Sequence, residues 1–129
     1  MKKILIIDDD PRLRQALSAF LRNAGYDVTA EEGPENLLAG KYERPDIILL
    51  DRHLEATDGL DVCRLLKQQP ATSAIPIVMI SGSPAVKAQA GQAGANDFID
   101  KPFDLRHILK MIQFHSKYGR GAGSPDETN

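Results

Sequence analysis

The most constraining feature of the sequence is its alternation between short, unbroken apolar runs and longer amphipathic segments. The clearest apolar runs occupy residues 4–7, 47–50 and 77–80. Each is too short for a helix that is buried on all sides. Runs without alternate polar residues are typical of strands that are covered on both faces. Helical spacing, with apolar residues at steps of three and four, follows the first run at Leu13, Ala16, Leu17, Phe20, Leu21 and Ala24.

This alternation predicts a single α/β domain. Strands that alternate with helices form right-handed crossovers and a parallel sheet. Five such units can be read, so we expect a doubly wound (βα)5 domain with helices on both faces of a five-stranded sheet. Two less regular strands are expected at 26–30, near a sheet edge, and at 98–99. Helices are expected at 11–24, 34–41, 59–69 and 85–93, and from residue 105 onward.

Several helix ends carry recognisable local signals. Asp10 followed by Pro11 is typical of an N-cap and a first helical position. Gly25 follows the same helix as a C-terminal glycine. Asp58 and Gly59 indicate a turn and the start of another helix, a structural role.

The composition is that of one compact domain. The chain has 129 residues, 42% of them hydrophobic, and a formal net charge of -2. Such a balance argues against sequence-independent binding of nucleic acid or membrane. The single cysteine, Cys63, allows no internal disulfide and suits a reducing compartment, so we expect a cytoplasmic protein. We expect the domain to span residues 1–117, and residues 118–129 to be a disordered tail or the stub of a linker.

The residues at the ends of the predicted strands carry the chemistry. The first strand is followed by Asp8 and Asp9, the third by Asp51, the fourth by Ser81 and the fifth by Lys101. Ligands of open α/β sheets bind outside the carboxyl ends of the strands. We therefore expect these side chains at one rim of the sheet.

Such a set suits phosphoryl transfer. Gathered carboxylates repel one another unless a cation lies among them, and Mg²⁺ prefers oxygen ligands of this kind. An aspartate can also accept a phosphoryl group. The transfer needs mainly positioning and positive charge, which Mg²⁺ and Lys101 can supply. Ser81 can donate a hydrogen bond to a phosphoryl oxygen.

Four stretches resemble the bacterial response-regulator receiver family, whose fold is called CheY-like. They read ILIIDDDP, PDIILLDRHLEATDGLDVC, IPIVMISGS and ANDFIDKPFD. The resemblance runs from about residue 3 to about residue 113. It implies a sheet in the strand order 2-1-3-4-5. It also implies a phosphoryl group received from a phosphohistidine on a sensor histidine kinase or a histidine phosphotransfer protein.

The resemblance also implies roles for residues at the rim. Asp51 would accept the phosphoryl group. Asp8, Asp9 and Asp51 would hold Mg²⁺, together with the backbone carbonyl of His53. Lys101 would contact the phosphoryl group.

A switch is implied as well. Ser81 would be drawn toward the phosphoryl group and Phe98 would turn inward with it. Relatives usually signal to a protein partner through the face made by the fourth helix, fifth strand and fifth helix. The alanine-rich segment 85–93 is the element expected to shift, since its small side chains bury little area. The chain would then act only on itself, so we expect a signalling domain and not an enzyme.

The chain departs from the family pattern near the acceptor. Ser81 and Gly82 stand where Thr and Ala are commoner, and Glu55 replaces the usual proline. Arg52 and His53 are bulkier and more basic than common residues there. Because His53 lies beside the expected entry path of the attacking water, these changes bear on the lifetime of the phosphorylated state.

Three other functions remain open at the level of sequence. A phosphatase of the haloacid-dehalogenase type would use Asp8 as nucleophile and Asp10 as acid and base, and would leave Asp51 without a role. A flavin- or nucleotide-binding domain of the same topology would need a phosphate loop, where this chain has three aspartates. A receiver-like interaction module that never carries phosphate is the third. No basic recognition helix or second domain points to direct DNA binding.

Overall fold

The computed structural model describes residues 2–118 and has the predicted doubly wound topology. Five parallel strands form one sheet in the order β2-β1-β3-β4-β5, which confirms the expected order. The strands are β1 (Lys3–Ile7), β2 (Asp27–Glu31), β3 (Ile47–Asp51), β4 (Ile77–Ser81) and β5 (Asp97–Asp100). The helices are α1 (Pro11–Asn23), α2 (Glu35–Leu38), α3 (Gly59–Gln68), α4 (Val86–Gln92) and α5 (Leu105–Tyr118). Residues 119–129 of the predicted tail lie outside the described residues.

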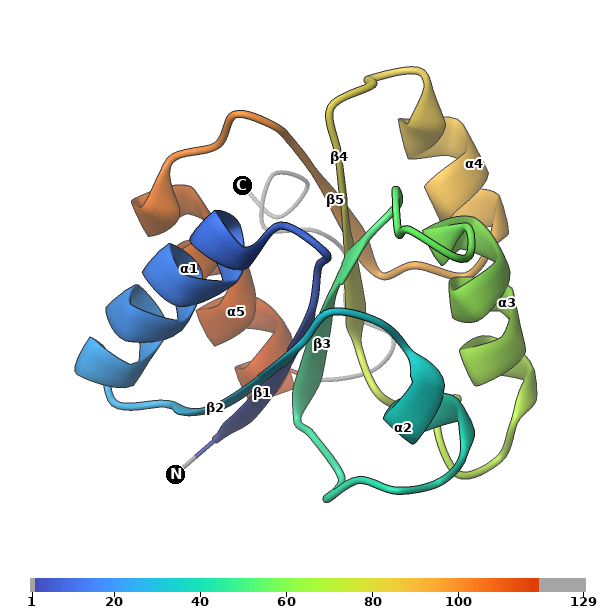
Figure 1. Ribbon diagram of the computed structural model, residues 1–129, viewed down its shortest axis with the longest axis horizontal. Helices are drawn as coiled ribbons and strands as arrows, with labels where there is room; N and C mark the ends of the chain where they lie inside the picture. Colours follow the sequence, from blue (N-terminus) through green and yellow to red (C-terminus); the bar gives the residue numbers. More distant parts are fainter. Residues whose placement is uncertain (1, 119–129) are drawn as a thin grey trace.

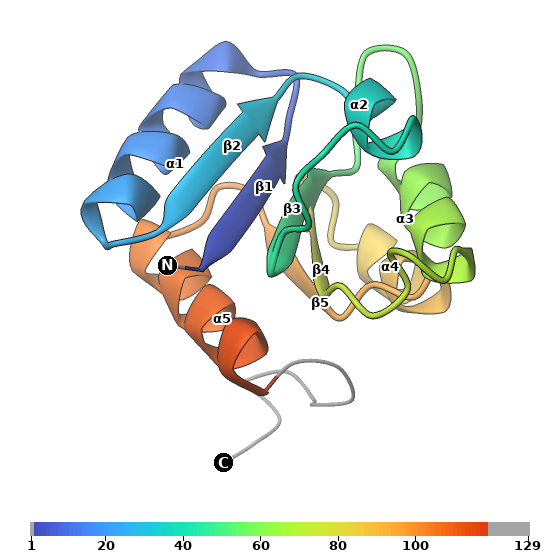
Figure 2. The same cartoon turned by 90° about the horizontal axis from the view of Figure 1, so that it is seen from below.

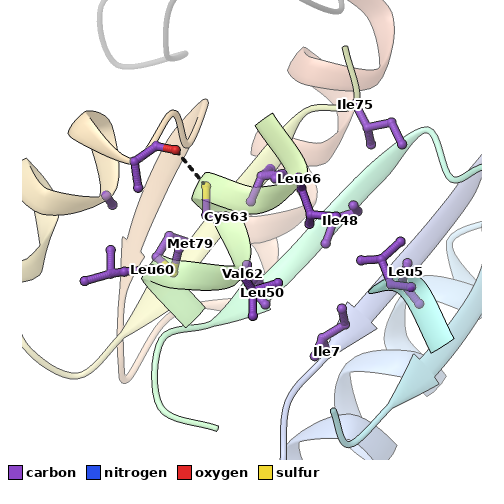
Figure 3. Close-up of a cluster of buried hydrophobic side chains, with 14 of the residues drawn as sticks. Leu5, Ile7, Ile48, Leu50, Leu60, Val62, Cys63, Leu66, Ile75 and Met79 are labelled. Atoms are coloured by element: carbon purple, nitrogen blue, oxygen red, sulfur yellow. Dashed lines mark hydrogen bonds between the residues drawn. The ribbon is translucent and has the colours of Figure 1, made fainter. Parts of the chain in front are cut away.

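Helices cover both faces of the sheet. Figure 1 shows α1 and α5 on one side of the strands and α2, α3 and α4 on the other, and Figure 2 shows the same layers from below. Successive side chains of a strand point to opposite faces. Leu5 and Ile7 accordingly join the apolar cluster under α3, which Figure 3 shows, whereas Ile4 and Ile6 pack with α1 and α5. This two-sided burial explains why the central strands are continuous apolar runs.

The first helix begins as predicted. The Asp10 carboxylate accepts hydrogen bonds from the backbone N–H groups of Arg12, at 2.9 Å, and Leu13, at 3.5 Å. Pro11 occupies the first helical position, where its missing N–H needs no partner. Gly25 has a φ of 99°, a conformation that side chains disfavour, and turns the chain into β2.

Most elements differ from their predicted bounds by one residue at one or both ends, and the second helix differs by more. The second helix spans only Glu35–Leu38 because the chain leaves the helical path at Gly40, whose φ is 76°. Strand β2 begins at Asp27, one residue later than predicted, and is an edge strand as expected. Strand β5 is longer than predicted, since Asp97 and Asp100 extend it on either side.

The contact between α3 and α4 is made of small side chains. Cys63 is fully buried, as predicted for a small hydrophobe, and its thiol lies 3.5 Å from the carbonyl oxygen of Ala93 (Figure 3). Helix α4 itself buries only Val86 and Ala90. None of the described helices combines the length and the apolarity that a membrane span requires.

Candidate phosphoryl-acceptor and metal site

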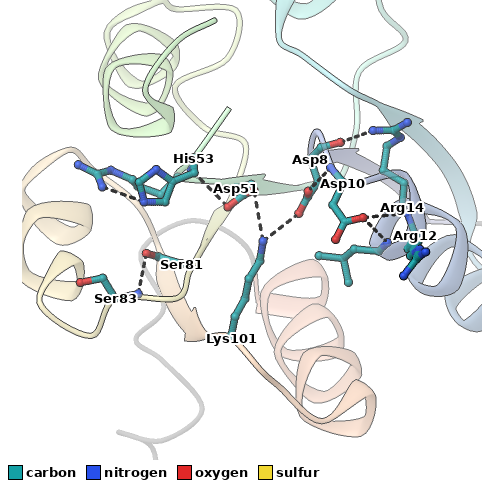
Figure 4. Close-up of polar contacts among 11 residues, drawn as sticks. Asp8, Asp10, Arg12, Arg14, Asp51, His53, Ser81, Ser83 and Lys101 are labelled. Carbon is teal, nitrogen blue, oxygen red and sulfur yellow. Dashed lines mark hydrogen bonds and ion pairs between the residues drawn. The ribbon is translucent and has the colours of Figure 1, made fainter. Parts of the chain in front are cut away.

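The carboxyl ends of β1, β3 and β5 bring two carboxylates and a lysine into contact (Figure 4). Asp8 follows β1, Asp51 ends β3 and Lys101 follows β5. The Lys101 Nζ lies 3.2 Å from Oδ2 of Asp51 and 3.5 Å from Oδ2 of Asp8. Lys101 lies 50 residues after Asp51 in the sequence, and the order of the strands makes the three groups neighbours.

Three carboxylates converge at this point. One oxygen from each of Asp8, Asp9 and Asp51 lies within 4.8 Å of the others. Asp8 and Asp51 are buried, whereas Asp9 is accessible to solvent. The Asp8 Oδ1 accepts a hydrogen bond from the N–H of Asp10, but its Oδ2 has no hydrogen-bond partner among the described residues. A buried carboxylate oxygen that is approached only by the Lys101 ammonium, at 3.5 Å, and lies beside two further carboxylates fits the oxygen ligand set of Mg²⁺.

The electrostatics of the site are strongly coupled. Burial, and then the neighbouring Asp8 carboxylate, raise the pKa of Asp51, and the Lys101 ammonium only partly opposes them. Burial also acts to lower the pKa of Lys101, but Asp51 and Asp8 together outweigh it and leave the pKa raised. Lys101 therefore stays charged at neutral pH. It is one cation facing more than one carboxylate, which leaves the pocket attractive to a second cation.

The loop after Asp51 is held by its own polar contacts. The N–H of His53 lies 3.3 Å from Oδ1 of Asp51. The His53 side chain is exposed, with its Nε2 3.2 Å from an Nη1 of Arg52. Arg52 also pairs with Asp58, the N-cap of α3, at 3.2 Å. The His53 ring is thus engaged by Arg52, and the backbone of His53 faces Asp51.

A glycine allows this loop to approach α3. The N–H of Gly59 donates to the carbonyl oxygen of Arg52 at 2.7 Å. A Cβ on Gly59 would lie 2.8 Å from the Cα of Arg52 and would also overlap the carbonyl oxygen of Asp51. The sequence predicted only a turn and helix start at Gly59. Its close contact with the backbone of Asp51 was missed, because the two lie in different elements.

Ser81 and Lys101 join the ends of β4 and β5. Ser81 is fully buried, and its Oγ accepts a hydrogen bond from the N–H of Ser83 at 3.1 Å (Figure 4). The N–H of Lys101 donates to the Ser81 carbonyl oxygen at 2.9 Å. The peptide bond between Lys101 and Pro102 is cis. Phe98 is half-buried and packs against the apolar cluster on the α3 and α4 side.

Two contacts near these elements were not anticipated. An Nη1 of Arg14, one turn into α1, donates to the carbonyl oxygen of Asp8 at 2.7 Å. His115 was given no role, yet it is fully buried against Asp97. The apolar stripe of α5 was the available signal, since a step of three residues from Ile112 reaches His115.

Comparison with known proteins agrees with this geometry. A family model described as the response regulator receiver domain matches residues 4–113. The DNA-binding dual master transcriptional regulator RpaA of Synechocystis is 38% identical over 116 residues, which cover 88% of this chain and 48% of RpaA. The chain thus spans about half the length of the curated relatives it matches.

Solved structures extend the similarity to the fold. The chemotaxis response regulator CheY4 of Vibrio cholerae is 31% identical, with a TM-score of 0.80 over 88% of this chain and 98% of CheY4. The receiver domain of the sensor histidine kinase PA1611 from Pseudomonas aeruginosa, solved with magnesium in its active-site cleft, is 28% identical. Its TM-score is 0.80 over 90% of this chain and 98% of that domain. This chain therefore belongs to the family of response regulator receiver domains, the signalling domains of two-component systems.

Proposed function

We propose that this domain accepts a phosphoryl group on Asp51 in a Mg²⁺-dependent reaction, with a phosphohistidine of a histidine kinase or histidine phosphotransfer protein as donor. One observation carries the proposal. The Lys101 ammonium lies 3.2 Å from the Asp51 carboxylate. Asp8 and Asp9 each have a carboxylate oxygen within 4.8 Å of an oxygen of Asp51. This arrangement supports Asp51 as the acceptor and the neighbouring carboxylates as metal ligands.

Asp51 acts as the nucleophile. One of its carboxylate oxygens attacks the phosphorus, the bond between phosphorus and the donor imidazole nitrogen breaks, and a mixed anhydride forms on Asp51. The electron pair of the broken bond stays on the imidazole. Lys101 pairs with oxygens of the transferred group, and this pairing replaces part of the contact between Lys101 and Asp51. Asp8, Asp9, Asp51 and the backbone carbonyl of His53 would hold Mg²⁺, which would supply positive charge to these oxygens.

The conformational response begins at Ser81. Its hydroxyl accepts a hydrogen bond from Ser83 before phosphorylation, and it is the group proposed to turn and donate to a phosphoryl oxygen. Ser81 pairs with Asp100 at the end of β5, so rotation of the Ser81 hydroxyl is proposed to displace β5. Phe98 of β5 is the aromatic residue proposed to rotate inward. Phosphorylation thereby favours one of two arrangements of the β4–α4 loop. Helix α4 is the element proposed to shift, since it buries only two of its side chains.

Water resets the switch. Attack of a water molecule on the phosphorus returns Asp51 to a free carboxylate and releases phosphate. The domain thus catalyses only its own phosphorylation and dephosphorylation and turns over no separate substrate. Arg52 and His53 lie at the entrance to Asp51, so they are the residues proposed to set the lifetime of the anhydride.

The proposed output is a protein partner on the face formed by α4, β5 and α5. Some relatives are named as DNA-binding regulators, but the chain spans about half of their length, and its net charge of -2 supports protein contact over direct DNA binding. We propose a cytoplasmic location, which the single, unpaired and buried Cys63 supports.

The phosphatase alternative receives less support from the geometry. It uses Asp8 as the nucleophile and needs the Asp10 carboxylate free to act as acid and base. The Asp10 carboxylate is occupied as the N-cap of α1. Asp51, which that reaction would not use, is the residue that Lys101 contacts most closely.

Intact-mass measurement with acetyl phosphate tests the proposal. We expect the wild type to gain one phosphoryl group in the presence of Mg²⁺ and to gain none in excess EDTA. Asp51→Asn should gain none under either condition. Lys101→Ala should be phosphorylated about 100-fold more slowly, the usual effect of removing one charge-stabilising group, whereas the matched surface variant Lys87→Ala should behave as the wild type.

Two results would contradict the proposal. The first is an equal gain of mass by Asp51→Asn and the wild type. The second is phosphorylation of the wild type that proceeds at the same rate in EDTA as in Mg²⁺.

A further inference from the structure

A buried polar pair at the start of β5 takes no part in the proposed reaction. His115 on α5 is fully buried, and its Nε2 lies 2.9 Å from Oδ2 of Asp97, the first residue of β5. The Asp97 side chain is only 7% exposed. A buried pair of this kind contributes little to stability compared with apolar side chains of similar volume. Its presence therefore points to a role beyond packing.

The Asp97 carboxylate bridges two elements. Its Oδ1 accepts a hydrogen bond from the N–H of Phe98 at 2.9 Å, while its Oδ2 faces His115. An ionised carboxylate only accepts hydrogen bonds, so the Nε2 of His115 carries the proton of this contact. One side chain thus ties the backbone of Phe98 to the C-terminal part of α5.

This bridge connects the two faces of the sheet. Phe98 packs against the cluster on the α3 and α4 side. Its neighbour Ile99 packs on the opposite face with Ile108 and Ile112 of α5. Alternation along the strand puts Asp97 on the same face as Ile99. A displacement of Phe98 on one face can therefore reach α5 on the other through a single residue.

The second nitrogen of His115 is unsatisfied. Its Nδ1 is buried and has no hydrogen-bond partner among the described residues. The ring meets Phe114 edge to face, with centroids 5.1 Å apart and planes at 85°. A buried nitrogen without a partner disfavours the arrangement that contains it. Among the described residues, the ring is therefore hydrogen-bonded only through Nε2.

We propose that Asp97 and His115 form a link that reports the state of Asp51 to the last turn of α5. The inference rests on the proposed function, in which Phe98 moves when Asp51 is phosphorylated. A shift of the β5 backbone that accompanies the inward rotation of Phe98 moves the Phe98 N–H against the Asp97 carboxylate, and His115 follows the carboxylate. Asp97 lies four residues before Lys101, or roughly 13 Å along an extended strand. It acts as a positioning residue at the opposite end of β5 from the reaction.

Backbone amide NMR spectra with and without beryllofluoride, a phosphoryl analogue, test this link in the presence of Mg²⁺. In the wild type we expect the amides of Ser81 and Ser83 and those of residues 112–118 to shift. In His115→Leu the Ser81 and Ser83 shifts should persist, while the shifts of residues 112–118 should fall to less than a quarter of the wild-type values. His115→Gln, whose amide nitrogen can replace Nε2 as a donor to Asp97, should restore them.

A double variant controls for the possibility that His115→Leu acts by destabilising the fold. Asp97→Ala combined with His115→Leu leaves neither partner buried without the other, and it should decouple residues 112–118 in the same way. Shifts of residues 112–118 that are equal in the wild type and in the two decoupled variants would overturn the link. So would wild-type spectra in which Ser81 shifts and residues 112–118 do not. If Ser81 itself does not shift, the proposed function fails, and the link fails with it.

Discussion

At the scale of single residues, the site depends on burying more negative than positive charge around Asp51. Asp51 is 3% exposed, and the Lys101 ammonium is shared between Asp51 and Asp8. In the metal-free protein this arrangement is unfavourable, because an ionised carboxylate loses hydration on burial and meets a second carboxylate. The proposed cation site therefore lowers the stability of the free domain.

This cost predicts that Asp51→Asn stabilises the metal-free protein at neutral pH. The pKa of Asp51 is raised in the folded state, so its contribution to stability is greatest below the ordinary pKa of about 4 and is lost as pH rises through the folded-state pKa. Removing the charge should raise the free energy of unfolding at pH 7 by roughly 1 kcal/mol, the usual size of a single-substitution effect. Urea unfolding of the wild type and of Asp51→Asn in EDTA measures this difference in the free energy of unfolding.

The same measurement at acid pH serves as its control. Near pH 3.5 the carboxyl group is largely neutral in both states, so the stability gain of Asp51→Asn should disappear. A gain that stays constant from pH 3.5 to pH 7 would show that the charge of Asp51 is not its cause.

Cys63 provides an independent check of burial on the α3 and α4 side. Burial raises the pKa of its thiol to about 11, and the nearby Lys67 and Arg64 only partly oppose it. We expect native protein at pH 8 to react with an aromatic disulfide reagent at least 100-fold more slowly than protein unfolded in urea, since only the thiolate attacks. Comparable rates in the two conditions would contradict the packing of Cys63 against Ala93.

The stability of the wild type should also depend on this thiol at alkaline pH. Its contribution is complete below the unfolded pKa, near 8.5, and is lost as pH rises toward 11. The stability advantage of the wild type over Cys63→Ala should therefore shrink across this interval.

At the scale of elements, the start of α3 fixes the loop that follows Asp51. Gly59 is the point of contact, because a Cβ there would lie 2.8 Å from the Cα of Arg52. The Asp58 carboxylate caps the same helix and also pairs with Arg52. The position of α3 and the conformation of the loop that follows Asp51 are therefore interdependent.

Glycine substitutions separate this contact from general glycine effects. Gly59→Ala should destabilise the domain by about 1–3 kcal/mol, as overpacking does, and should weaken Mg²⁺ binding, because the backbone next to Asp51 must move. Gly91→Ala is the matched control. It lies inside α4 with open space around it, and it should stabilise by about 0.5–1 kcal/mol. Thermal unfolding measures the change in stability, and Mg²⁺ titration measures the change in affinity. Equal effects of Gly59→Ala and Gly91→Ala would refute the proposed contact.

The elements differ in how well the sequence predicts them. Residues 47–50 are recognisable because burial on both faces leaves no polar residue in the run. The shortness of α2 was not predictable from apolar spacing, since it depends on the left-handed turn at Gly40. The extension of β5 to Asp97 was missed because the side-chain partner of this acidic residue, His115, lies eighteen residues away.

At the scale of the whole molecule, the topology assembles the site. Parallel strands in the order 2-1-3-4-5 bring Asp8, Asp51 and Lys101 to one rim, and the sequence predicted this from the rule that ligands bind at the carboxyl ends of the strands. The rule cannot supply the contact geometry. The pairing of Lys101 with both carboxylates depends on side-chain positions that only the packed structure defines.

The central claim is that Asp51 is the phosphoryl acceptor of this assembled site. Reduction with borohydride tests it most directly, because it converts the acyl phosphate of an aspartate into homoserine at the modified position. After treatment with acetyl phosphate and Mg²⁺, peptide mass spectrometry should find homoserine at residue 51 and aspartate at residues 8 and 9. Homoserine at residue 8 or 9, or unmodified aspartate at residue 51 in protein that carries the phosphoryl group, would contradict the account.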